Sequence, residues 1–141
     1  MTYASLDDLI ERSGDAEIRA IADRDRDGVP DAAVIAEALQ DADNLINSYV
    51  GAKYAVPLET VPPIVNTWAI SIARYFLHRN GAPDHVKTDY DNAVAAAKDV
   101  ARGLGTLPVA PGDPAVTPSS ATVVAAHPDQ VFTPDRLRGW R

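Results

Sequence analysis

The residues whose spacing best matches a known chemistry are four aspartates in a short polar segment. The segment reads Asp23-x-Asp25-x-Asp27-Gly28-x-x-Asp31. This spacing reproduces the first nine positions of an EF-hand loop, in which carboxylates surround Ca²⁺ and a glycine allows the sharp bend. Asp23, Asp25, Asp27 and Asp31 are therefore the candidate metal ligands of the chain, and Ca²⁺ is the candidate cofactor.

The same segment also departs from the calcium motif. Position twelve, which supplies a bidentate Glu in EF-hands, is Val34. Arg24 and Arg26 alternate with the aspartates and can neutralise them within the loop. Asp31 is also well placed to cap the helix that follows. The sequence therefore favours a solvated capping loop without a cofactor, and a calcium site is the alternative.

Motifs for catalysis are missing from the chain. The three histidines, His78, His85 and His127, are too scattered to form a metal set. The sequence contains no nucleophile elbow, no phosphate-binding glycine loop, no His-Glu-x-x-His helix and no kinase motifs. We therefore predict that the protein is not an enzyme.

Paired acidic residues are the remaining candidates for a catalytic site. The pairs are Asp7 with Asp8 and Asp41 with Asp43. Neighbouring residues of a helix point to diverging faces, so neither pair is expected to act on one substrate. A packed cleft that holds a carboxylate with a strongly raised pKa would revive this alternative.

Composition and charge restrict the fold and the partners. The 141 residues include no cysteine, so packing alone must hold the fold, as is usual in a reducing cytoplasm. Residues 1–102 carry ten Lys and Arg against 17 Asp and Glu, which accounts for the net charge of −7. An acidic body disfavours binding to nucleic acid. We also expect no export signal and no membrane span, because the chain has no long apolar run.

Hydrophobic periodicity predicts an all-α fold, a small bundle of four main helices. The clearest helix runs from about 31 to 50, where apolar residues recur every three or four positions. The other expected helices are a short one near residues 5–13, a second short one through Ile18 and Ile21, and longer ones near 63–80 and 83–103. Trp68, Tyr75 and Phe76 follow the same spacing and are predicted to be core residues rather than a ligand site.

After Gly103 the composition changes from helical to Pro-rich. Six of the eleven prolines and four of the eight glycines lie in residues 103–141. We therefore divide the chain into a helical domain, 1–103, and an extended C-terminal tail, 104–141. Two apolar islands interrupt the tail, at 121–125 and 131–141.

The second island is the candidate docking site. Large apolar residues in a polar tail are usually covered by the chain's own body or by another chain, and we favour a partner. The predicted docking residues are Phe132, Leu137, Arg138, Trp140 and Arg141.

Short segments along nearly the whole chain form a recognisable order. They are 3–10, the Asp-rich turn 23–31, 46–50, 54–58 with 61–63, 72–77, 90–103 and the ending 131–140. In order and spacing these segments resemble the Mu-type phage head-tail joining proteins. Relatives of that family in other long-tailed phages are helical adaptor subunits beneath the portal ring.

The resemblance implies a function in the virion. The helical domain would be an adaptor domain, and many copies would form a ring on the portal around a channel for DNA, which passes without specific binding. The tail would be a docking arm that reaches neighbouring subunits, the portal protein, or head-closure and tail proteins. The particle would be assembled in the cytoplasm of the bacterial host. The competing interpretation is a calcium-binding helical regulatory protein that uses the loop from Asp23 to Asp31.

Overall fold

Residues 2–109 are described by the computed structural model, and their regular elements are helices. The five helices are α1 (Leu6–Ser13), α2 (Asp15–Ala22), α3 (Ala32–Val50), α4 (Pro63–Leu77) and α5 (Asp84–Arg102). The predicted all-α class is confirmed. The two short helices that the sequence predicts before residue 23 are both present, and they meet at Gly14, whose φ is 86°.

Three helix boundaries lie where the sequence marks them, whereas α4 ends at Leu77 and not near residue 80. Ser5 and Asp8 form a capping box, in which the Asp8 N–H donates to Ser5 Oγ (3.2 Å) and the Ser5 N–H donates to Asp8 Oδ2 (2.8 Å). Pro63 is the first residue of α4. Gly103 ends α5 in the left-handed region, with φ of 79°.

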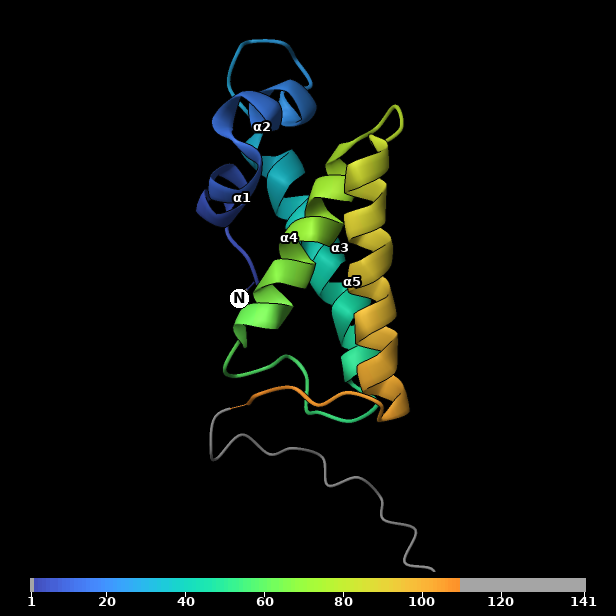
Figure 1. Cartoon of the computed structure of the whole chain (residues 1–141). Helices are drawn as coiled ribbons and strands as arrows, with labels where there is room; N and C mark the ends of the chain where they lie inside the picture. Colours follow the sequence, from blue (N-terminus) through green and yellow to red (C-terminus); the bar gives the residue numbers. More distant parts are fainter. Residues whose placement is uncertain (1, 110–141) are drawn as a thin grey trace, which may run out of the picture.

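The three long helices pack side by side, and the two short helices cover one side of this bundle (Figure 1). The loop with the four aspartates connects α2 to α3 at one end of the molecule. Residues 104–109 run along the opposite end, below the connection between α3 and α4. The molecule therefore presents the aspartate loop and the start of the tail at opposite ends.

The core lies among all five helices. Its largest fully buried side chains are Leu9, Ile18, Ile46, Val50, Val65, Ile72, Leu77 and Val86. Burying one such side chain contributes about 1.5–3 kcal/mol. Trp68 is buried as predicted, whereas Tyr75 and Phe76 are half-buried. The ring of Tyr75 stacks on Tyr90 of α5, with 4.2 Å between the centroids.

Tyr3 joins the N-terminal segment to the bundle through hydrogen bonds from both its backbone and its side chain. Its N–H donates to both carboxylate oxygens of Asp43, at 3.1 Å each. Its hydroxyl donates to Asn47 and accepts the N–H of Leu58 at 2.9 Å, and its carbonyl accepts Asn66 Nδ2 at 3.0 Å. Asp43 is only 3% exposed, so this cluster lies in the core.

No helix of the described range is long and apolar enough to cross a membrane.

Candidate functional site

The structure brings three of the four predicted metal ligands together. One carboxylate oxygen each of Asp23, Asp25 and Asp27 lies within 4.8 Å of the others. Asp31 does not join them, because its Oδ2 accepts the backbone N–H of Arg24 at 2.8 Å. Asp31 is the N-cap residue of α3, as its position predicts. The predicted capping hydrogen bond is wrong, because the Asp31 side chain makes none at the start of α3.

Hydrogen bonds from the loop's own backbone organise the three carboxylates. Desolvation acts against ionisation of Asp23, but N–H groups that include those of Gly28 (2.8 Å) and Asp27 (3.2 Å) outweigh it and lower the pKa of Asp23. The Asp27 N–H also lowers the pKa of Asp25, but desolvation and the carboxylates of Asp27 and Asp31 outweigh this and raise the pKa of Asp25. A cation would relieve the repulsion at Asp25. Val34, at position twelve of the motif, is half-buried and supplies no oxygen ligand.

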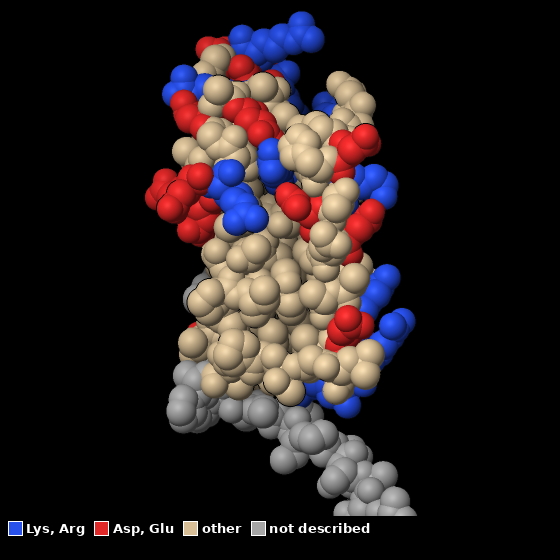
Figure 2. All heavy atoms as spheres, in the orientation of Figure 1, with Lys and Arg blue, Asp and Glu red and all other residues tan. Residues whose placement is uncertain are grey.

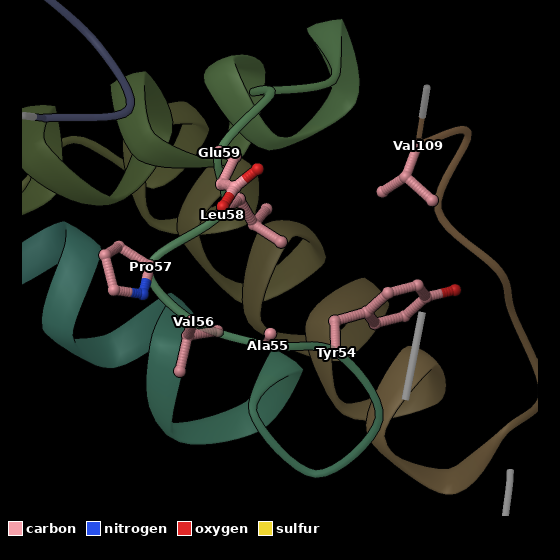
Figure 3. A pocket seen from close by; sticks show the side chains of 7 residues that line it. All are labelled: Tyr54, Ala55, Val56, Pro57, Leu58, Glu59 and Val109. Atoms are coloured by element: carbon pink, nitrogen blue, oxygen red, sulfur yellow. The ribbon is translucent and has the colours of Figure 1, made fainter. Parts of the chain in front are cut away.

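The start of the tail is attached to the opposite end of the bundle. Leu107 is buried, and its N–H donates to the hydroxyl of Tyr54 at 2.9 Å. A cavity of about 220 Å³ lies between residues 54–59 and Val109 (Figure 3). The predicted docking residues Phe132, Leu137, Arg138, Trp140 and Arg141 lie outside the described residues, and their role stays a prediction.

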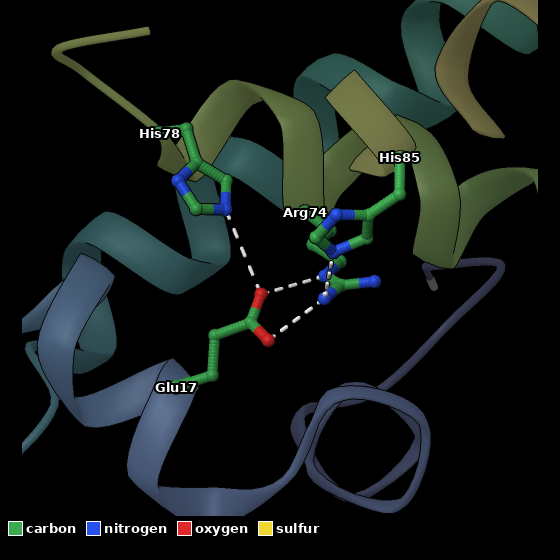
Figure 4. A network of polar contacts seen from close by, with 4 residues as sticks. All are labelled: Glu17, Arg74, His78 and His85. Atoms are coloured by element: carbon green, nitrogen blue, oxygen red, sulfur yellow. Dashed lines mark hydrogen bonds and ion pairs between the residues drawn. The ribbon is translucent and has the colours of Figure 1, made fainter. Parts of the chain in front are cut away.

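A polar network that the sequence reasoning missed connects α2 to α4 and α5 (Figure 4). Arg74 holds Glu17 in a bidentate ion pair, with both N···O distances at 2.7 Å, and this hydrogen bonding lowers the pKa of Glu17. Nε2 of His78 lies 3.6 Å from Glu17, and Nε2 of His85 lies 3.4 Å from Arg74 Nη2. The histidines that flank the turn between α4 and α5 therefore both face this ion pair.

The candidate acid pairs do not converge on a shared site. Asp8 belongs to the capping box of α1, and Asp43 binds the N–H of Tyr3 in the core. Asp7 and Asp41 are exposed. Burial raises the pKa of Asp43, while the hydrogen bond from Tyr3 opposes this change. The pKa of Asp43 is thus raised, but its carboxylate is buried and bound to the Tyr3 N–H rather than placed in an open cleft.

Charged side chains are unevenly spread over the surface. In Figure 2 they gather over α1, α2 and the aspartate loop and along the outer edge of α5, whereas the lower middle of the same face is almost uncharged. The reason is partly the composition of α4, in which Arg74 is the single charged residue among 15. Depletion of charge at the centre of a surface, with charges around it, is typical of protein–protein interfaces.

Comparison with known proteins relates the chain to phage proteins. The family described as "Bacteriophage Mu, Gp36" matches residues 3–126. The Mu-like prophage FluMu protein gp36 of Haemophilus influenzae is 36% identical over 114 residues, which cover 81% of each chain. Gene product J of Escherichia phage Mu is 27% identical over 141 residues, or 99% of each chain.

Proposed function

Because the chain belongs to the bacteriophage Mu Gp36 family, we propose that it is a structural head-tail connector subunit of a long-tailed phage or phage-like particle. Copies of the chain form a ring beneath the portal, around the channel for DNA. The partners are the portal protein, the head-closure or tail proteins, and further copies of the chain. The observation that carries the proposal is the match to the family through both the helical body and the first part of the tail, at residues 3–126.

The charge of the body supports a place beside DNA without binding to it. The chain carries a net charge of −7, and the acidic excess lies in residues 1–102. Phosphate binding requires clustered Lys and Arg, whereas like charge repels the polyanion. Such a wall lets DNA move through a channel without holding it.

The roles of the buried and bonded acids support a function without catalysis. Glu17 pairs with Arg74, Asp8 caps α1 and Asp43 holds Tyr3. Each of these carboxylates is hydrogen-bonded to another group of the fold. The protein is thus a component of the virion that is assembled in the host bacterium.

The experiment is deletion of the gene from the phage or prophage that encodes the chain, followed by electron microscopy of the products. We expect DNA-filled heads and separate tails, because the proposed connector acts at the step that joins them. Expression of the intact chain from a plasmid should restore joined particles. Joined particles in the deletion strain, or a failure to assemble heads, would contradict the proposal.

A second candidate function, a calcium-binding regulatory protein, is favoured by the convergence of Asp23, Asp25 and Asp27. With the Glu of position twelve missing, we expect weak affinity, at best about 10⁻⁴–10⁻³ M. Calorimetric titration of the full chain with CaCl₂ checks this. Saturable binding heat that is present in the wild type and absent in the Asp25→Asn variant supports a calcium site. Equal heats for the wild type and the variant exclude the site.

A further inference from the structure

A groove on the weakly charged face between α4 and α5 has no role in the contacts described above. Its walls are formed by Thr67, Trp68 and Ser71 of α4 and by Ala93 and Ala96 of α5. The volume of the groove is about 300 Å³. Because its residues come from two helices that pack directly against each other, the groove is a fixed part of the bundle.

The walls of the groove are less polar than their residue types suggest. Thr67 Oγ1 donates to the carbonyl of Pro63, and Ser71 Oγ donates to the carbonyl of Thr67, each at 3.0 Å. Both hydroxyl protons are therefore directed to carbonyls of their own helix. The groove thus presents mainly methyl groups and part of the Trp68 indole to an occupant.

Three polar residues also line the groove. They are Arg12 of α1 and Asp89 and Asn92 of α5. From Asp89 to Ala96 the helix rises about 10 Å, at about 1.5 Å per residue. Three residues of an extended chain cover that length at about 3.3 Å each. The groove therefore suits a short extended segment with small apolar side chains.

The longest segment of this kind in the tail lies near residue 121. Residues 114–128 include no Asp, Glu, Lys or Arg, and at their centre lies Ala121-Thr122-Val123-Val124-Ala125. The side chains of this island are small, three of the five are β-branched, and such residues favour an extended backbone. The exposed amide of Asn92 can pair with the backbone of an extended chain. Size, charge and backbone preference all fit the groove.

We infer that the groove between α4 and α5 binds residues 121–125 of a second copy of the chain. Val109, the last described residue, lies at the base of the bundle, and eleven residues separate it from Ala121. The Cα atoms of Val109 and Ala121 can therefore lie up to about 40 Å apart, whereas α5, with 19 residues, is about 28 Å long. The tail is thus long enough to reach the body of a neighbour. This inference rests on the proposed function, because it requires copies that lie side by side.

The absence of cysteine from the chain allows a direct test by disulfide cross-linking. Ala96→Cys places a thiol in the groove, and Val123→Cys places one in the island. Mixing the two single-cysteine proteins under mild oxidation should give a mixed dimer. The matched control is Ala36→Cys, an exposed position on α3 outside the groove. We expect at least tenfold more mixed dimer with Ala96→Cys than with Ala36→Cys.

The double variant Ala96→Cys/Val123→Cys identifies which copy supplies the island. Both the purified protein at high concentration and assembled particles are oxidised and run on non-reducing gels. A ladder of multimers supports exchange between copies. A cross-linked monomer shows that the chain's own tail fills the groove, and no cross-link beyond the Ala36→Cys background in either preparation shows that the island does not bind there. Either result overturns the inference, while the gene-deletion phenotype tests the connector function independently.

Discussion

Deleting residues 130–141 is expected to abolish joining of heads to tails while leaving the melting temperature of the body nearly unchanged. The deleted segment carries Phe132, Leu137 and Trp140, which include the two aromatic side chains of the tail. Aromatic residues of this kind, together with Arg, supply much of the binding energy of protein interfaces. The described core is formed entirely by residues before 110, so the deletion removes none of it. Infectious titre should therefore fall to the level of the gene deletion.

Two measurements make this prediction decisive. Thermal unfolding of the truncated protein checks the body, and electron microscopy of the mutant lysate checks the joining step. Trp140→Ala should reduce the titre in the same direction, whereas Gln130→Ala, a polar residue at the edge of the island, should not. Unfolding of the truncated protein would show that the tail packs on its own body. Normal titres would show that the docking residues are dispensable.

Asp43→Ala is expected to give a large loss of stability for a single substitution. It removes the acceptor of the Tyr3 N–H, which is buried, and leaves a space beside α3. Loss of a hydrogen bond to a charged group costs about 1.5–3 kcal/mol, since the remaining partner stays buried and unpaired. Urea unfolding should show this loss for Asp43→Ala and a smaller one for Asp43→Asn, whose amide keeps one acceptor. Equal stability of Asp43→Ala and the wild type would contradict the assigned role.

The pH dependence of the same variants has a defined sign. Burial raises the pKa of Asp43 in the folded state, so the folded protein binds this proton more tightly than the unfolded chain. The contribution of Asp43 is therefore fully present below its unfolded pKa of about 3.9 and decreases as the pH rises through the folded pKa. The stability of the wild type relative to Asp43→Asn should fall as the pH rises over this window. A constant or opposite difference would contradict it.

Glu17 should behave in the opposite way. Its pKa is lowered by Arg74, so its contribution is present above its unfolded pKa and is lost as the pH falls through the folded value. Acid unfolding of the wild type includes the contributions of both Asp43 and Glu17. The Asp43→Asn variant lacks the contribution of Asp43, so the difference between the two proteins isolates it.

The helices and the spacing of the aspartates could be predicted from local sequence alone. Ser5, Pro63 and Gly103 act on the backbone within one turn of their own positions, and apolar periodicity reports which face of each helix is buried. Both are local properties, so they can be derived without knowing how the helices meet. The three converging carboxylates of the loop lie within five residues and were predictable for the same reason.

Which of these local elements meet, and which contacts they form, depends on how the helices pack and could not be predicted from local sequence. Tyr3 and Asp43 are 40 residues apart and Arg74 and Glu17 are 57 apart, so neither contact has a signature in local sequence. The groove exists only because α4 and α5 pack with Thr67 and Ala96 on the same side. Asp31 was a good capping residue by its position, yet the N–H of Arg24 competes for its carboxylate. Side-chain partners depend on the packing of all the helices at once, because a buried polar group binds the nearest partner that the completed fold provides.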